Sequence, residues 1–272
     1  MAGPSELEVV ALGAFAGLTI YLGMPLARAR GLGPRTRAAF SAFACGILAF
    51  IFFDVLANAT GLIDARLAAG DRAAWAADAA ILLTGFVVGV ISLVVVEAIF
   101  RRRGATEAEL QGEPIGERGS LAPLTLATMI ATGIGLHNFS EGLAIGASYA
   151  SGALGLGAVL VIGFAIHNST EGFGILGPGM MAGTRFSTMR LLGLGLLGGG
   201  PTFLGTIFGS LVSSDPLSIL FYGLAAGAIL YVVLTMARPL LAQATRDIAF
   251  VALAIGFTAG YLTDLVVAYG GG

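Results

Sequence analysis

The 272-residue chain has no lysine, only two histidines and a single cysteine, Cys45. One cysteine cannot form an intrachain disulfide, which excludes a disulfide-stabilised scaffold. Only 11 % of the residues are charged, about half the share of an average soluble domain, whereas 57 % are hydrophobic. This composition excludes an ordinary soluble domain, and nucleic acid is not an expected partner.

Long apolar stretches take up most of the sequence. The mean hydropathy is +0.92, and a helix needs about 20 apolar residues to cross a bilayer. Eight stretches reach that length, so we predict an all-α membrane protein with eight transmembrane helices in the lipid bilayer, a single transmembrane domain over residues 1–272. The predicted helices are Glu8–Ala27, Ala38–Ala59, Ala80–Phe100, Pro123–Ser148, Ala153–Leu176, Met189–Val212, Pro216–Ala237 and Asp247–Tyr269.

Arginine is the only basic residue type besides histidine, and its positions predict the orientation of the chain. Twelve of the 14 arginines lie in the loops that follow the first, third, fifth and seventh apolar stretches. The other two, Arg66 and Arg72, share their loop with three aspartates. Because basic loops stay in the cytoplasm, both termini are predicted to be extracellular or periplasmic. We expect the chain in the plasma membrane, which is the inner membrane in a bacterium.

One segment between the helices lacks apolar periodicity. Residues 101–121, between the third and fourth stretches, mix arginine, glutamate, glycine and proline. A segment of this composition does not bury enough apolar surface to fold. We predict a flexible cytoplasmic loop there.

A short polar signature, His-Asn-x-x-Glu-Gly, occurs twice, in the fourth and fifth apolar stretches. The copies contain the only two histidines of the chain, each four residues before a glutamate. On a helix this spacing puts imidazole and carboxylate on one face, one turn apart. A glutamate inside a membrane helix costs about 3 kcal/mol or more unless it is paired, solvated or bound to a cation, so a functional role is the default. The polar residues of the two copies are His137, Asn138 and Glu141, and His167, Asn168 and Glu171.

The two stretches that carry the signature form a predicted hairpin. The short turn near residues 149–152 leaves both copies at similar depth, near the middle of the bilayer. Facing each other, they offer imidazole, amide oxygen and carboxylate, a set that suits Zn²⁺, Fe²⁺ or Mn²⁺. The lack of a thiolate or a methionine cluster argues against copper(I), and the two histidines argue against Mg²⁺ and Ca²⁺.

Other interpretations of the signature stay open. Each His–Glu pair could be a hydrogen-bonded pair between helices that binds no metal. An intramembrane metal-dependent hydrolase is an alternative function, because His and Glu ligands with an open position activate water. Its usual marks, His-Glu-x-x-His and a third histidine, are missing, so we do not expect an enzyme. A purely structural scaffold would not require polar clusters at mid-depth.

The repeated signature, the eight expected helices and the cytoplasmic loop before the fourth helix together resemble the ZIP (Zrt/Irt-like protein) family of divalent metal transporters. The resemblance implies movement of Zn²⁺, and also Fe²⁺, Mn²⁺ or Cd²⁺, into the cytoplasm by alternating access. The metal is then a substrate, and no prosthetic group is expected. It also implies that Asp54 and Asp264, near the outer ends of the second and eighth helices, attract metal. A homodimer stays open as the assembly. The implied transport site consists of His137, Asn138, Glu141, His167, Asn168 and Glu171.

The chain departs from the family pattern at three places. Ser140 and Thr170 precede the signature glutamates, where many members have proline. The sixth stretch carries no carboxylate, so a second bound ion stays open. The predicted cytoplasmic loop contains no histidine, although many relatives have a histidine-rich loop.

Overall fold

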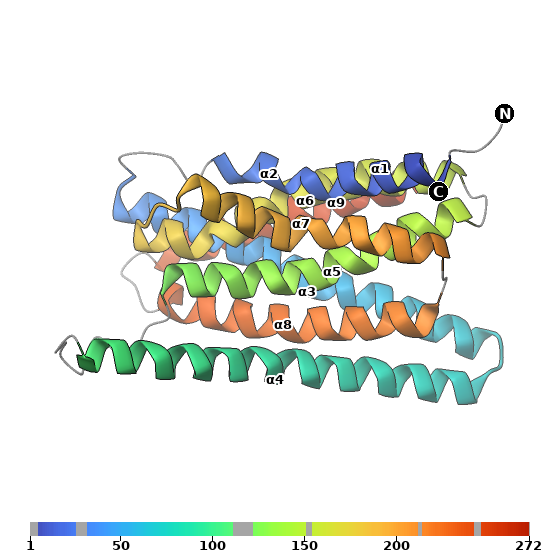
Figure 1. The fold of residues 1–272 in the computed structure, drawn as a ribbon, viewed down its shortest axis with the longest axis horizontal. Coiled ribbons are helices and arrows are strands. Elements are labelled where there is room, and N and C mark those ends of the chain that lie inside the picture. Colours follow the sequence, from blue (N-terminus) through green and yellow to red (C-terminus); the bar gives the residue numbers. More distant parts are fainter. Residues whose placement is uncertain are drawn as a thin grey trace.

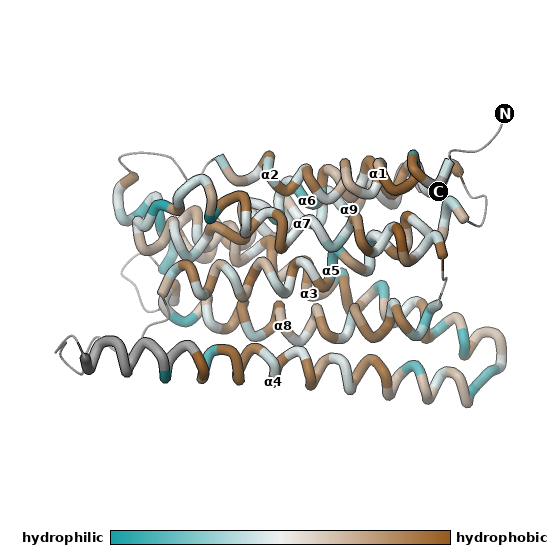
Figure 2. The backbone as a smooth tube through the Cα atoms, in the orientation of Figure 1, coloured by the Kyte–Doolittle hydropathy of each residue, from teal (hydrophilic) through white to brown (hydrophobic). Residues whose placement is uncertain are grey.

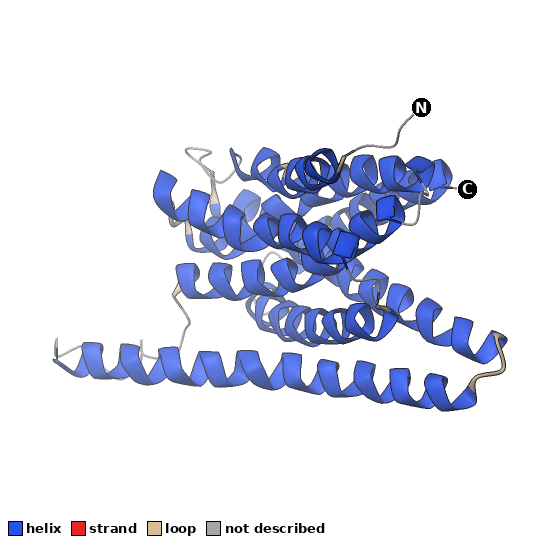
Figure 3. Cartoon of the chain, turned by 45° about the vertical axis from the view of Figure 1, so that its right-hand side comes forward, coloured by secondary structure: helices blue, strands red, loops and turns tan. Residues whose placement is uncertain are grey.

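The structure is a computed structural model that describes residues 5–25, 32–110, 122–150, 154–211, 214–241 and 246–271. Within these ranges almost every residue is helical and no strand occurs (Figure 3). The helices are α1 (Glu6–Leu18), α2 (Ile20–Gly23), α3 (Pro34–Ala68), α4 (Arg72–Leu110), α5 (Pro123–Ala150), α6 (Leu154–Ala182), α7 (Thr188–Leu211), α8 (Asp215–Leu241) and α9 (Arg246–Gly271).

The helices lie side by side along one common direction (Figure 1). α4 lies at one side of the bundle and contacts mainly α8, whereas α1 and α2 lie at the opposite side. Hydrophobic residues fill the middle of α4, and hydrophilic residues gather toward its beginning (Figure 2). The beginning of α1 and the end of α9 lie at the same end of the bundle.

Six of the described helices are long and apolar enough to cross a membrane: α3, α4, α6, α7, α8 and α9. α5 has 28 residues but is not among the six, because His137, Asn138 and Glu141 lower its hydropathy. α1 and α2 together form a shorter apolar stretch, Leu7–Gly23. The chain is therefore an all-α protein with the long apolar helices of a multi-pass membrane protein.

The second and third predicted segments extend further than expected. α3 continues to Ala68 and α4 begins at Arg72, so the turn between them is short and passes through Gly70. Gly70 has a φ of 80°, a conformation that favours glycine. Arg66 and Arg72, predicted in a loop, therefore lie on helices.

α4 also continues past its predicted end. Residues 101–110, expected to belong to the loop, form its last turns, and residues 111–121 lie outside the described residues. Alanine, arginine and glutamate favour helix over loop, so the helix does not end where the apolar stretch ends.

The first predicted segment is divided into two helices. α1 begins with a capping box in which the Ser5 backbone N–H donates to Glu8 Oε2 at 2.6 Å. It ends at Leu18, and the next residue, Thr19, donates its hydroxyl to the carbonyl of Ala16 at 2.6 Å. α2 then continues to Gly23, and the predicted end at Ala27 lies outside the described residues.

The helices are described below in two groups, which also contact each other through α3 and α6, α5 and α8, and α6 and α9. The motif group consists of α1, α2, α5, α6 and α7, and the flanking group of α3, α4, α8 and α9. Inside each group, glycines bring backbones together: a Cβ on Gly205 would meet the carbonyl of Phe139, and one on Gly256 that of Phe43. Such close approach is typical of interlocked membrane helices.

Side chains, not backbones, make the nearest contacts between the two groups. A Cβ on Gly174 of α6 would lie 3.6 Å from a methyl group of Leu48 on α3, an ordinary van der Waals distance. Large buried aliphatic side chains fill this boundary, among them Ile51 of α3, Ile134 of α5 and Ile229 of α8. The hydrophobic core therefore lies where the two groups meet.

Candidate metal centre

The two copies of the signature meet in the interior of the bundle. His137 lies near the middle of the 28-residue helix α5, and His167 near the middle of the 29-residue helix α6. The two imidazole rings have a centroid separation of 5.8 Å. The expected hairpin therefore brings both signatures to one place. All six of their predicted ligand residues are buried.

The ligand atoms of these residues are spaced as a metal ion requires. His137 Nε2 lies 3.3 Å from Glu141 Oε1 and 3.8 Å from Glu171 Oε1. His167 Nε2 also lies 3.8 Å from Glu171 Oε1. Ligands about 2.1 Å from a tetrahedral zinc ion lie roughly 3.4 Å from each other. A small shift of these side chains would bring them to that geometry.

Unpartnered polar atoms are concentrated in the signatures. Nine side-chain nitrogen or oxygen atoms in the described ranges are buried without a hydrogen-bond partner, and seven belong to the six signature residues. They include His137 Nε2, His167 Nε2 and one oxygen of each glutamate. His137 and Glu141 are close, but they are not aligned as a hydrogen bond. Buried polar atoms normally have a hydrogen-bond partner. A bound cation would be a partner for these atoms, so their clustering in the signatures is typical of a cation-binding site.

The two asparagines connect the centre to neighbouring helices. Asn138 Nδ2 donates to Glu171 Oε2 at 2.8 Å and to the carbonyl of Gly198 on α7 at 3.0 Å. Asn168 Nδ2 donates to the carbonyl of Ala16 on α1 at 3.0 Å. These bonds use both amide N–H donors of Asn138 and one of Asn168, and both Oδ1 atoms are buried without a partner.

A residue that sequence reasoning missed orients His167. Thr263 of α9 donates its hydroxyl to the carbonyl of Gly260 at 2.6 Å. Its Oγ1 lies 3.2 Å from His167 Nδ1, so it accepts the Nδ1–H of a neutral imidazole. Nε2 is then free to bind metal, and this is the usual arrangement around a metal-ligating histidine. The family resemblance drew attention only to its neighbour Asp264, which it placed near the outer end of the eighth predicted helix.

Asp54 lies closer to the histidines than expected. One ligand atom from each of Asp54, His137 and His167 lies within 4.8 Å of the other two. The sequence suggested that Asp54 attracts metal from a position nearer the membrane surface, whereas the structure brings it to the cluster itself. Asp264 lines a cavity of about 140 Å³ together with Asp54, Glu141 and both histidines. This cavity is called the central pocket below.

The charges of the centre favour a divalent cation. Three carboxylates, those of Asp54, Glu141 and Glu171, surround two imidazoles that carry no charge when they bind metal. No arginine in the described ranges forms an ion pair with them. Burying like charges together is costly unless a cation offsets them.

The glycine after each glutamate has a packing role. A Cβ on Gly142 would collide with the carbonyl of Thr202 on α7, and one on Gly172 with that of Ile20 on α2. The signature glycines therefore let the two helices that carry the signatures pack tightly against the rest of the motif group. Ser140 and Thr170, the residues before the signature glutamates, each donate a hydroxyl to a carbonyl of their own helix.

No protein-family model matches this chain, and no curated protein does.

Proposed function

We propose that this chain transports divalent transition-metal ions across a membrane, with Zn²⁺ as the leading substrate and Fe²⁺, Mn²⁺ and Cd²⁺ as further ones. The ion binds at the middle of the membrane between α5 and α6, through His137, Glu141, His167 and Glu171. Asn138 and Asn168 belong to the same site. The duplicated signature supports placing the chain in the ZIP family.

One observation carries this proposal. Seven of the nine unpartnered buried polar atoms in the described ranges cluster in the two signatures, at the middle of helices in an apolar protein. Their nitrogen and carboxylate oxygen atoms suit a borderline divalent ion. Intramembrane ionisable residues of this kind are typical of ion pathways.

The proposed topology has eight crossings and both termini outside. α1 with α2 and the polar helix α5 supply the two crossings beyond the six apolar helices. Arginines support the sidedness. The beginnings of α3, α7 and α9 lie at one end of the bundle (Figure 1), and the first turns of these helices carry Arg37, Arg190 and Arg246. Basic residues at one end favour that end as cytoplasmic. In the proposed direction of transport, the metal ion crosses from the outside into the cytoplasm.

Alternating access is the proposed mechanism. A multidentate His–Glu site holds its ion tightly, so release requires a change in the surroundings of the site. The two helix groups supply such a change, because both signatures belong to the motif group, whereas Asp54 and Asp264 belong to the flanking group. A relative movement of the groups would separate the histidines from Asp54 and expose the ion to the other side.

The test is metal flux in liposomes. Purified protein is reconstituted with a zinc-sensitive dye inside, and uptake by the parent is compared with that of Glu141→Ala and Glu171→Ala. We expect saturable uptake by the parent and a loss of about 100-fold or more in either variant, because a ligand is removed. Monodisperse elution of each variant controls for folding. Wild-type rates in both variants, or no uptake by the parent, would reject the proposal.

A further inference from the structure

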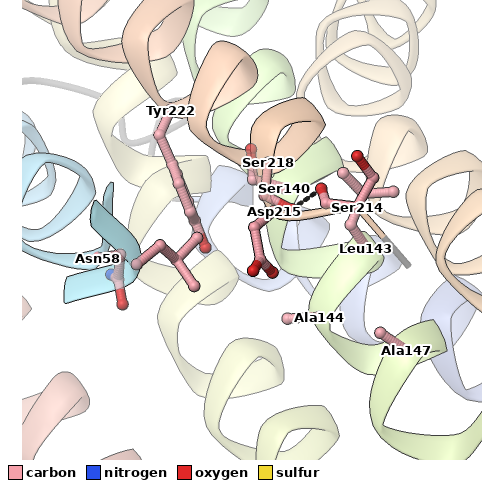
Figure 4. Close-up of a pocket in the computed structure, with 10 residues that line it drawn as sticks. Asn58, Ser140, Leu143, Ala144, Ala147, Ser214, Asp215, Ser218 and Tyr222 are labelled. Carbon is pink, nitrogen blue, oxygen red and sulfur yellow. Dashed lines mark hydrogen bonds between the residues drawn. The ribbon is translucent and has the colours of Figure 1, made fainter. Parts of the chain in front are cut away.

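A second polar cavity lies beside the central pocket, between α3, α5 and α8. Its volume is about 200 Å³, and six of its ten lining residues are polar. Asp215, at the first turn of α8, is the only charged residue among them (Figure 4). Asn58, Ser140, Ser218 and Tyr222 supply polar groups around it. This cavity is called the outer pocket below.

The outer pocket adjoins the central pocket through a shared wall. Asn58, Ala144 and Tyr222 line both cavities. Asn58 also donates its amide to Asp54 Oδ1 at 3.0 Å, which connects the wall to the metal centre. A polar path therefore leads from Asp215 past Asn58 to Asp54.

Asp215 belongs to an ion-pair cluster that has a net negative charge. Arg66 Nη2 lies 2.9 Å from Asp215 Oδ2, and Arg66 Nε lies 3.0 Å from the buried Asp78. The three side chains together carry one net negative charge. In Figure 4 the carboxylate of Asp215 points toward the space between Tyr222 and Ala144. Its side chain is 46 % exposed, so the pocket reaches the protein surface.

The two pockets differ in the groups that they offer to an ion. Both have room for several water molecules, at about 200 Å³ for the outer pocket and about 140 Å³ for the central pocket. The outer pocket offers hydroxyl and amide groups and one carboxylate, which suit an ion that keeps its waters. The central pocket offers two imidazoles and carboxylates, which can replace those waters.

We infer that the outer pocket is a waiting site for a hydrated divalent cation on its way from outside to the His–Glu centre. Asp215 is the carboxylate of this site. Asn58, Ala144 and Tyr222 form the boundary that the ion crosses as it loses its waters. The inference rests on the proposed transport function. It adds a binding site and a direction of approach to that function.

Cysteine modification tests the route in intact cells. Cys45 is the only cysteine and is buried, so Cys45→Ala gives a cysteine-free parent. Ser218→Cys then places a thiol in the outer pocket, and Ala147→Cys provides a second position on its α5 wall. We expect a membrane-impermeant, cationic thiosulfonate reagent to abolish Zn²⁺ uptake by both variants, because it fills the pocket and repels the ion. External Cd²⁺ should slow the modification.

Thr60→Cys is the matched control. Thr60 lies two residues from Asn58 on α3, is exposed and lines neither pocket. Its modification should leave uptake unchanged. If the pocket cysteines are not labelled from outside, or are labelled without loss of uptake, the waiting site is wrong while the transport function stands. Absence of uptake by the wild-type protein would overturn both.

A charge variant tests the role of Asp215. Asp215→Asn should raise the apparent KM for Zn²⁺ roughly three-fold to ten-fold at low salt, with an unchanged maximal rate, because a weak electrostatic attraction is lost. Asp215→Glu keeps the charge and should restore the parent KM. Equal loss of maximal rate in both variants would indicate a structural role only, and an unchanged KM in Asp215→Asn would overturn the inference.

Discussion

The two helix groups are built in the same way but contribute different parts of the metal centre. In each, glycines bring backbones into contact: Gly205 meets α5 in the motif group, and Gly256 meets α3 in the flanking group. The motif group carries both histidines and both glutamates, whereas the flanking group contributes Asp54, Asp264 and Thr263. In the proposed mechanism, the polar residues of the motif group stay together and those of the flanking group separate from them.

We expect the boundary between the groups to permit the proposed movement. Its contacts are between side chains, such as Leu48 against the helix at Gly174, and they lack the backbone interlocking found inside each group. Side-chain contacts between aliphatic residues are exchanged at little cost, whereas an interlocked backbone pair must separate completely. We expect the ion to stay with the motif group while its contacts with the flanking group change.

Loss of both histidines should have the largest effect. In His137→Gln, His167→Gln, we expect Zn²⁺ affinity at pH about 7.5 to fall about 100-fold or more, because two nitrogen ligands from the motif group are removed. The parent should also lose affinity as pH falls from about 7.5 to about 5.5, because metal requires neutral imidazole and protons compete for it. An unperturbed histidine titrates near pH ~6.5.

Calorimetric titration at several pH values measures both effects. The double variant should bind weakly with a flatter pH dependence, and its helical content should match that of the parent. Parent affinity that does not change with pH would contradict histidine ligation, as would an equally steep pH dependence in the variant.

Glycine substitutions should separate the two kinds of contact. Gly205→Ala should destabilise the protein by about 1–3 kcal/mol, because its Cβ collides with the backbone of α5. Gly174→Ala, at the boundary between the groups, should be neutral or slightly stabilising, because its Cβ has room and alanine favours helix. Thermal unfolding in detergent measures the difference. Equal losses of stability in both variants would show that contacts inside the groups and contacts between the groups do not differ.

Much of this arrangement is predictable from the sequence. Long apolar stretches predict the helices, and the i,i+4 spacing of histidine and glutamate predicts that each pair shares a face. The short link near residue 150 then predicts that the two copies meet, as they do. These features depend on local sequence or on a short connection between neighbouring helices.

The contributions of the flanking group could not be predicted in the same way. The proximity of Asp54 to the histidines and the bond from His167 to Thr263 depend on how α3 and α9 are rotated about their axes. That rotation is set by contacts with residues far away in the sequence, and apolar residues all round these helices give no periodic signal for it. The full lengths of α3 and α4 were missed because helix propensity continues beyond the apolar stretch.

Removing the oxygen that orients His167 should have a moderate effect. Thr263→Val keeps the shape of the side chain but removes the acceptor for Nδ1–H, so we expect Zn²⁺ affinity to fall roughly ten-fold. Thr263→Ser keeps the hydroxyl and serves as the control. Calorimetry on the purified variants measures the change. If Thr263→Val binds as tightly as Thr263→Ser, the flanking group does not help to orient the ligand.

Neutralising the flanking carboxylates should have the smallest effect, confined to low metal concentration. We expect the double variant Asp54→Asn, Asp264→Asn to raise the apparent KM for uptake several-fold at low salt, because these charges raise the local ion concentration. High salt should reduce the difference. Unchanged KM values over the whole salt range would remove both aspartates from the path of the ion.

Anomalous scattering from a zinc-bound crystal tests most directly whether the two signatures form one ion site. Data collected on both sides of the zinc absorption edge locate the ion without reference to any assumed ligand. The account predicts a peak between α5 and α6, about 2.0–2.2 Å from an imidazole nitrogen of each histidine and from a carboxylate oxygen of Glu141 or Glu171. A fully occupied peak elsewhere, with both histidines free of metal, would contradict it.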